Sequence, residues 1–377
     1  VWAMGEWPYW YPNLFQGMPL MALMHPGVFY PPSLLFLLDD FSFAFNAYFL
    51  FHHLVLTGSV YALCRYWDLS ISASLSASLT ALLGGFFLSL ASVYNQFQSA
   101  IWLPLILLMW QKFTTEGRLK YFCGAVVFLA IQVLGGGPEN AIFSVLLVYV
   151  HSLYLEKTEE KIKGFRYKTL AMFMLVGAAL ALSALQWLPT YCLLKETGRG
   201  NGLPFYASTT WSLEPGILLD LFLPRNFAHF LELDGGEMGY FVHSFYMGIV
   251  PLFVLLGSLL IGREIKAIRL WLMVFGAGVF FALGEFNPLY SWFYEWVPLF
   301  NMFRFPQKFF FFCAFSLVFL SAWGLDRFVH VITHKKMETK KLLLVLLAIA
   351  MVVAGMFGTY SNRAGLETLL ILLLIAV

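Results

Sequence analysis

Apolar runs long enough to cross a bilayer follow one another along this chain, separated by loops that are alternately rich and poor in Lys and Arg. A helix of about 20 apolar residues spans the hydrocarbon core of a membrane. The composition agrees, because 60% of the residues are hydrophobic and 12% are charged, whereas about 25% are charged in soluble domains. The pattern predicts an all-α, polytopic membrane protein.

We expect a single transmembrane domain over residues 1–377, built from about eleven segments. Several runs are short, which is typical of broken helices that wrap a cavity. Val1 opens into an aromatic loop and the last run stops within apolar sequence, so we expect a fragment of a longer chain. The expected segments are 43–66, 71–92, 98–111, 121–135, 140–155, 169–189, 246–262, 270–284, 307–329, 342–360 and 366–377.

The charge of the loops predicts their side of the membrane. Most of the 23 Lys and Arg fall in one set of loops, which the positive-inside rule makes cytoplasmic. The other loops are rich in aromatic residues, Pro and Gly, and three of them are too long to be simple turns. We expect these outer segments, 1–42, 190–245 and 285–306, to form an irregular extracytoplasmic cap, where we look for function.

The predicted outer face carries charged side chains that suit phosphate chemistry. Glu139 follows three glycines and a proline at the start of an apolar run, which suggests a site; a carboxylate favoured by the helix dipole is the alternative. Glu6 is a second candidate catalytic carboxylate. Arg304 and Lys308 are four residues apart, so one helix face could hold both against a phosphate, with snorkelling to headgroups as the alternative. Arg199 is a further candidate phosphate contact.

Aromatic and polar residues of the outer segments suggest contacts to a sugar or a lipid headgroup. Residues 8–32 are rich in Pro and Gly, which predicts a rigid, non-helical surface. Its rings suit either stacking on a sugar or an aromatic belt that anchors the protein. The candidate sugar or headgroup contacts are Trp10, His25, Tyr30, Asn95, Gln98 and Trp211, with interfacial solvation as the alternative for the two amides.

Other functional classes find little support in the sequence. The net charge of +2 gives no footprint for nucleic acid, and no phosphate-binding loop, dinucleotide fingerprint or serine-hydrolase elbow is present. Glu156 to Lys163 form a mixed-charge stretch, which favours a solvated helix end with pairs at i,i+4. His52 and His53 lie within the first run, and an interhelical hydrogen bond is the expected role of a histidine there.

A set of motifs resembles the YfhO-like family of bacterial integral membrane proteins, which has PLWNPY, FxGxPLLA and GVFYPP near its start. The matching residues, which cover nearly 5–330, are Pro8 to Pro12, Phe15, Gly17 to Leu20, Val28 to Pro32, His53 with Gly58, Ala100 to Pro104, Gly135 to Glu139, Gln186 to Thr190, Trp211 to Pro215 and Phe303 to Phe309. The chain departs from the family at Tyr11, Gly137 and Lys308, where Asn, His and Arg are usual.

This resemblance implies a glycosyltransferase of the GT-C-like class, which takes sugars from a polyprenyl-phosphate carrier at the outer membrane face. An acidic residue of the first outer loop is base or metal ligand in that class, and we expect it to lie before Val1. A divalent cation is therefore possible.

Sugar transfer needs a carboxylate to take the acceptor proton and cations to stabilise the departing phosphate. We therefore expect an enzyme of the bacterial cytoplasmic membrane that moves a polyprenyl-phosphate-linked sugar to an envelope glycan or lipid acceptor. The alternatives are a transporter or flippase for a lipid-linked glycan and a non-catalytic envelope scaffold.

Overall fold

The computed structural model describes residues 5, 7–12, 17–156, 160–221, 241–248, 266–298 and 300–334. Within these residues helices are the regular structure, and one isolated bridge joins Tyr11 to Met18. The chain divides into two compact units. The first unit comprises Val1–Trp67, Leu90–Thr210 and Pro288–Phe305, and the second comprises Asp68–Ser89, Trp211–Asn287 and Pro306–Val377.

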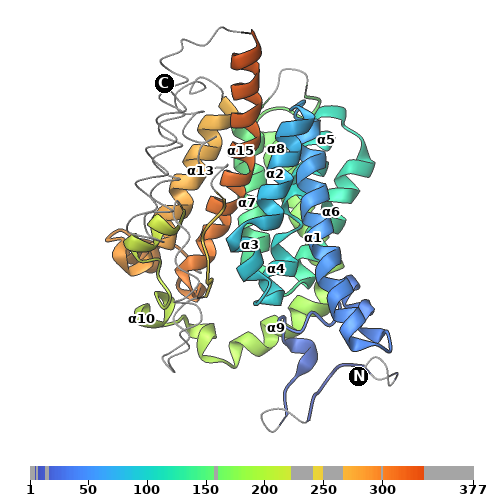
Figure 1. Ribbon diagram of the computed structural model, residues 1–377. Helices are drawn as coiled ribbons and strands as arrows, with labels where there is room; N and C mark the ends of the chain where they lie inside the picture. The colour runs from blue at the N-terminus through green and yellow to red at the C-terminus, as the bar shows by residue number, and fades with distance from the viewer. Residues whose placement is uncertain are drawn as a thin grey trace. The chain divides into compact units, whose positions relative to one another are not determined.

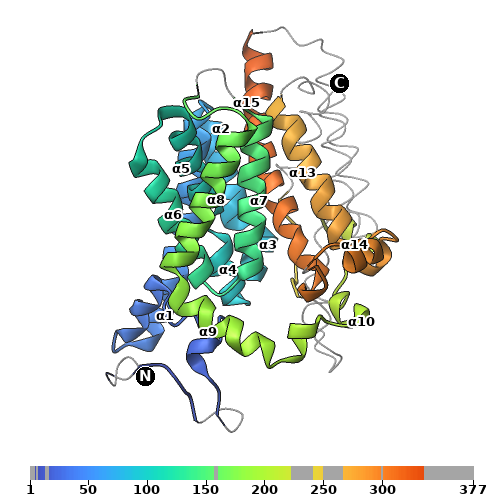
Figure 2. The same ribbon diagram turned by 180° about the vertical axis from the view of Figure 1, so that it is seen from behind.

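The first unit is a bundle of long helices with short helices at one end. α5 packs against α1, α6 and α7, and α8 packs against α6 and α7 (Figures 1 and 2). Its elements are η2 (Leu20–Ala22), η3 (Pro31–Leu37), α1 (Phe41–Tyr66), α4 (Tyr94–Ala100), α5 (Leu103–Glu116), α6 (Leu119–Leu134), α7 (Pro138–Tyr154), α8 (Phe165–Leu182), α9 (Ala184–Lys195), η4 (Gly198–Asn201), α10 (Phe205–Ser208), α14 (Tyr290–Trp296) and η7 (Phe300–Met302).

Local sequence sets where these helices begin and end. The Asp40 carboxylate accepts a hydrogen bond from the Phe43 backbone N–H at 3.0 Å, which caps the start of α1. Pro138 occupies the first turn of α7, where a missing N–H removes no helical bond. α5 ends at Gly117, whose φ of 68° is left-handed and suits glycine.

The two ends of the first unit differ in composition. At one, which we call the glycine end, residues 24–30, 95–102 and 135–139 come together. At the other, which we call the basic end, the Thr114 carbonyl accepts from the backbone N–H groups of Lys161 and Ile162 at 2.8 and 3.0 Å. Parts of the predicted outer loops, 24–30 and 135–139, thus lie at the start of α7, and part of a predicted cytoplasmic loop, 160–168, lies at its end. The membrane side of each end stays a prediction.

The mixed-charge stretch at the basic end is not the solvated helix end that the sequence favours. The Lys168 ammonium is fully buried and lies 2.6 Å from a Glu160 carboxylate oxygen and 3.0 Å from a Glu156 carboxylate oxygen. It also donates to the Ser152 carbonyl at 2.7 Å. The expectation of i,i+4 pairs on an exposed helix was wrong here because a lysine from the next helix takes both carboxylates.

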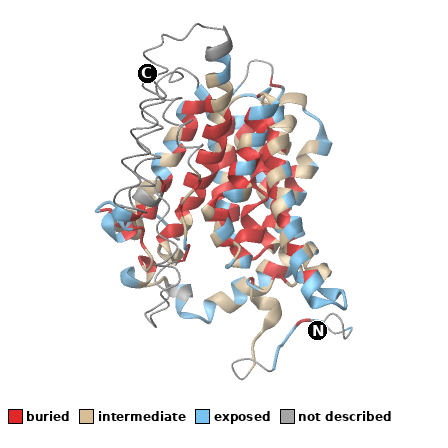
Figure 3. Cartoon of the chain, in the orientation of Figure 1, coloured by how far each residue is buried: buried red, intermediate tan, exposed pale blue. Residues whose placement is uncertain are grey.

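The second unit is built around one buried helix. α15 packs against α2 and α13, and most of its apolar part is buried (Figure 3). The Asp326 carboxylate accepts from the Ser70 backbone N–H at 2.8 Å and so fixes the start of α2 to α15. The elements are α2 (Ile71–Leu83), α3 (Gly85–Leu90), η5 (Pro215–Leu221), α13 (Lys266–Ala282), η6 (Gly284–Phe286), η8 (Pro306–Phe309) and α15 (Phe310–His334).

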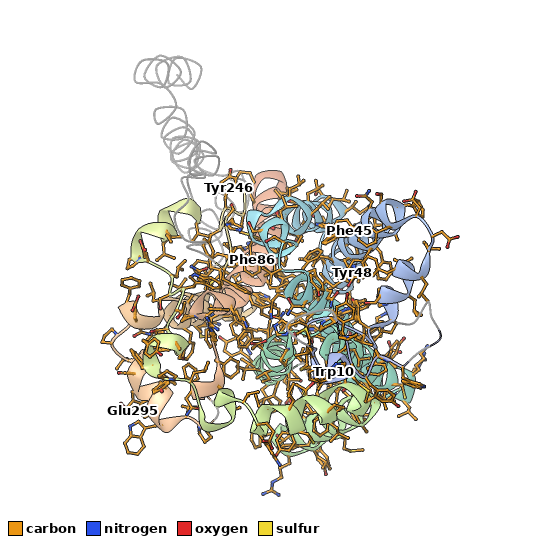
Figure 4. All side chains as sticks on the ribbon, turned by 90° about the horizontal axis from the view of Figure 1, so that it is seen from below. Trp10, Phe45, Tyr48, Phe86, Tyr246 and Glu295 are labelled. Carbon is orange, nitrogen blue, oxygen red and sulfur yellow. The ribbon has the colours of Figure 1, made fainter. Side chains whose placement is uncertain are left out.

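Several predicted runs are broken in the structure. The 71–92 run divides at Gly84, where the Gly85 N–H leaves the helix and donates to the Tyr246 carbonyl at 2.6 Å; Figure 4 labels Tyr246 and the neighbouring Phe86. The 98–111 run divides between α4 and α5, and the 169–189 run between α8 and α9. Most of 246–262, and all of 342–360 and 366–377, lie outside the described residues.

Four helical stretches of the described chain are long and apolar enough to cross a membrane: Phe41–Tyr66, Ile71–Leu90, Phe165–Leu182 and Pro306–His330. Leu119–Leu134 is apolar but shorter. These helices are compatible with a membrane protein. The full set of eleven segments and the cap stay predictions.

Candidate functional site

The glycine end is organised by a direct backbone contact between two distant segments. Gly136 has a φ of +84°, and a Cβ on it would overlap the carbonyl oxygen of Met24 and lie 3.4 Å from the Cα of His25. Only glycine therefore fits at Gly136 without displacing the 24–27 turn. His25 is exposed beside this contact.

Buried side chains of α4 fasten the glycine loop. Gln98 donates through Nε2 to the Gly135 carbonyl at 2.6 Å, and Asn95 donates through Nδ2 to the Gly136 carbonyl at 3.2 Å. The Ser99 hydroxyl donates to the Gly137 carbonyl at 2.9 Å. The predicted sugar contacts Asn95 and Gln98 therefore hold backbone in this structure, because buried polar groups need partners. Oε1 of Gln98 is buried with no hydrogen-bond partner among the described residues.

Tyr30 lies at the centre of a buried network at the same end. Its side chain is 1% exposed, and its hydroxyl oxygen accepts from Trp102 Nε1 at 3.0 Å and lies 2.8 Å from His52 Nε2. His52 Nδ1 lies 2.6 Å from the Tyr48 carbonyl, which can only accept, so Nδ1 carries a proton and Nε2 of the neutral ring accepts from Tyr30. Burial raises the pKa of Tyr30 well above its usual value. Tyr30 is thus a core residue, and its ring is not an exposed surface for sugar stacking.

Of the two histidines, His52 is the one that hydrogen-bonds to another segment, through Tyr30, whereas the family resemblance favours His53. His53 Nδ1 lies 2.9 Å from the Phe49 carbonyl of its own helix, and its Nε2 is buried without a hydrogen-bond partner among the described residues. The sequence did not single out His52 because the two residues are adjacent and only the packing decides which faces inward. Its spacing of four residues from Tyr48 was the available signal.

The segment before residue 13 presents aromatic rings to the surface. Trp10, labelled in Figure 4, is 55% exposed. One part of its indole lies over Gly17, where a Cβ would meet Trp10 Nε1 at 2.5 Å. Two backbone hydrogen bonds, of 2.8 and 3.0 Å, pair Tyr11 with Met18 and hold this turn. Trp10 is therefore held at the surface with much of its ring exposed.

Aromatic packing joins α7, which carries Glu139, to the segment that carries Arg304. Glu139 stands half-buried in the first turn of α7, and Phe143 one turn later stacks on Phe303 with ring centroids 6.1 Å apart. Arg304 follows Phe303, and its guanidinium lies 4.5 Å from the ring centre of Phe305. Arg304 Nε is buried with no hydrogen-bond partner among the described residues.

The helix face expected to carry both Arg304 and Lys308 does not exist. Residues 303–305 are not helical, Phe305 has a φ of +72°, and α15 begins only at Phe310. Lys308 belongs to the second unit, where its ammonium lies 5.5 Å from the Phe241 ring centre. The i,i+4 argument was wrong because it assumed an uninterrupted helix.

The remaining predicted contacts fall in other places. Trp211 lies in the second unit with its ring 6.0 Å from that of Phe241, so Trp211 and Lys308 share this neighbour. Arg199 lies in η4 with its side chain outside the described part, and Glu6 is outside the described residues. Within the described residues, no three His, Cys, Asp or Glu are grouped so as to hold a metal ion.

The glycine end therefore carries an exposed imidazole, His25, and a half-buried carboxylate, Glu139, while Arg304 and the exposed indole of Trp10 lie in other segments of the first unit. Side chains of these kinds can bind a phosphate group, take a proton and stack on a sugar ring. Comparisons with protein-family models, curated protein sequences and solved structures found no significant match for this chain.

Proposed function

We propose that this chain forms part of a bacterial membrane glycosyltransferase that resembles the YfhO-like family and the GT-C-like class. The enzyme would move a sugar from a polyprenyl-phosphate carrier to an envelope glycan or lipid at the extracytoplasmic face of the cytoplasmic membrane. The observation that supports the proposal is the close contact of the glycine loop, which leads into Glu139, with the segment of His25, together with the packing of Phe143 of α7 on Phe303, which precedes Arg304.

In the proposed reaction the acceptor hydroxyl oxygen bonds to the anomeric carbon as the bond from that carbon to the carrier phosphate breaks. Glu139 takes the hydroxyl proton, and its half-buried place at a helix start suits a carboxylate that must be charged before transfer. The carrier phosphate leaves with the electron pair and is stabilised by Arg304. Trp10 supplies a ring on which a sugar can stack.

The test is transfer of labelled sugar from a polyprenyl-phosphate donor by membranes that carry the full-length protein. Glu139→Gln should lower turnover about 10²–10⁴-fold, the usual contribution of a general base. Arg304→Ala should lower it about 10²–10³-fold, as for loss of one stabilising donor.

The matched controls are Glu116→Gln and Arg118→Ala, an ion pair of 3.4 Å at the basic end, which should leave turnover unchanged. Unchanged turnover in both site variants would remove this assignment. Movement of labelled carrier across liposomes without any product would favour a flippase instead.

A further inference from the structure

α14 is a short helix that is fastened to the first unit by one of its faces. Tyr290 is 1% exposed, and its ring centre lies 5.2 Å from that of Phe300. The Tyr294 hydroxyl donates to the Leu203 carbonyl at 2.6 Å, and the Tyr294 ring lies 5.3 Å from that of Phe205. These contacts fix which way the other faces of α14 point.

A second face of α14 is apolar and exposed. Leu289, Trp292 and Trp296 are 56%, 54% and 69% exposed, although they are among the most hydrophobic side chains of the segment. Their spacing of three and four residues places them in one stripe along the helix. Tyr206 of α10, the helix whose Phe205 contacts Tyr294, is 77% exposed.

A third face is polar and flanks the apolar stripe. Ser291 and Glu295 are four residues apart, so they share this side of the helix. Glu295, labelled in Figure 4, is exposed. α14 therefore has one face for protein, one for an apolar medium and one for water.

This division fits the headgroup zone of a bilayer better than bulk water or the hydrocarbon core. Tryptophan prefers the headgroup zone because its ring is apolar while its N–H needs a polar partner. The charge of Glu295 opposes deep immersion, since a carboxylate in the hydrocarbon core costs several kcal/mol. The chain also has helices that are long and apolar enough to cross a bilayer, so a headgroup zone next to α14 is compatible with the rest of the structure.

We infer that α14 is an interfacial helix, with Leu289, Trp292 and Trp296 among lipid headgroups and Glu295 turned to water. α14 packs on η7, which leads directly to Arg304. The depth of α14 in the headgroup zone thereby sets the depth at which Arg304 meets anionic groups. This inference does not depend on the reaction that the protein catalyses.

The test measures the depth of single spin labels in phosphatidylcholine–phosphatidylglycerol liposomes that contain the full chain. Of the four cysteines, Cys64 and Cys313 are buried, so Cys123→Ser and Cys192→Ser give a background without exposed thiols. Leu289→Cys and Trp296→Cys are then labelled separately, each leaving the rest of the stripe in place. Collision rates with oxygen, which concentrates in lipid, are compared with those of a water-soluble nickel chelate.

Three further labelled positions calibrate the measurement. Phe173→Cys, on an exposed site of the candidate span α8, reports the hydrocarbon, and Arg118→Cys, exposed at the basic end, reports water. The labels at 289 and 296 should give oxygen-to-nickel ratios several-fold above that at 118 and below that at 173. A label at Glu295→Cys should give a lower ratio than either stripe position.

Two results would overturn the inference. Ratios at 289 and 296 equal to that at Arg118→Cys would place the stripe in water. Slow motion with low collision rates for both reagents would mean that protein covers the stripe, whether another part of this chain or a second copy. Circular dichroism and gel filtration of each labelled variant identify any that fail to fold.

Discussion

At the glycine end of the first unit, neutral amides, hydroxyls and an indole fasten one backbone segment to another, whereas at the basic end a buried lysine fastens two carboxylates. Gln98 and Tyr30 typify the first arrangement, and Lys168 with Glu160 typifies the second. Both ends bury polar groups, but the consequences of losing a partner differ, because an unpaired buried charge is costlier than an unpaired amide.

The comparison shows how charge is distributed around the candidate site. Neutral side chains such as Asn95 and Ser99 donate hydrogen bonds that support the glycine loop. The charged side chain of Glu139 follows that loop in the sequence and is half-buried, as is Arg304 elsewhere in the same unit. Neutral side chains do not change their charge with pH, so such a support holds charged groups in fixed positions over a wide pH range. Fixed positions of charged groups are what electrostatic stabilisation of a transition state requires.

The largest expected effect is at the basic end. Lys168→Met should destabilise the protein by about 3–5 kcal/mol, because it leaves the buried Glu160 carboxylate without its cation. Unfolding in detergent micelles, followed by circular dichroism, measures the change. Arg118→Met, in an exposed pair, is the matched control and should change stability by about 1 kcal/mol or less. Equal effects of the two substitutions would remove the distinction between buried and exposed pairs.

A steric clash at the glycine end should lower the free energy of unfolding by a smaller amount. Gly136→Ala should cost about 1–2 kcal/mol for the left-handed backbone and about 1–3 kcal/mol more for crowding against Met24. The same unfolding assay measures it. Gly177→Ala, in α8 with open space at the Cβ position, is the control and should be neutral or slightly stabilising. Full stability of Gly136→Ala would show that the 24–27 turn moves aside easily.

Loss of one hydroxyl tests the neutral network itself. Tyr30→Phe should destabilise by about 1–3 kcal/mol, since His52 Nε2 and Trp102 Nε1 both lose their shared partner in a buried place. Tyr191→Phe, half-exposed on α9, serves as the control and should have little effect. If Trp102→Phe and Tyr30→Phe proved fully additive in a double-mutant cycle, the two residues would not be coupled as the distances indicate.

The ends of several helices could be predicted from sequence, and their breaks could not. α1 and α7 lie close to the expected 43–66 and 140–155 runs. These runs can be read from sequence because the thickness of a bilayer sets the length of an apolar helix that crosses it. The break at Gly84 arises from the Tyr246 carbonyl, which is distant in sequence. The sequence around Gly84 does not indicate which distant residue will accept the hydrogen bond.

For the candidate site, the sequence predicted the positions of some residues better than the roles of those residues. Glu139 at a helix start and an exposed Trp10 agree with the expected positions. The burial of Tyr30 depends on Trp102, 72 residues away, and the absence of a helix at Arg304 goes with the left-handed backbone of Phe305. Roles that depend on long-range packing need the structure.

The smallest expected effect concerns the pH dependence of the basic end. The Gly164 N–H and then the Lys168 ammonium lower the pKa of Glu156 below its ordinary value of 4.5. Because the folded pKa is the lower one, Glu156 contributes stability above pH 4.5 that is lost as the pH falls through the folded pKa. The loss should be about 1 kcal/mol or less, since the carboxylate is largely solvated. Glu156→Gln should remove this part of the stability difference between pH 6 and pH 3. If the variant and the parent lost stability equally over that range, the carboxylate of Glu156 would not be the group that links the basic end to pH.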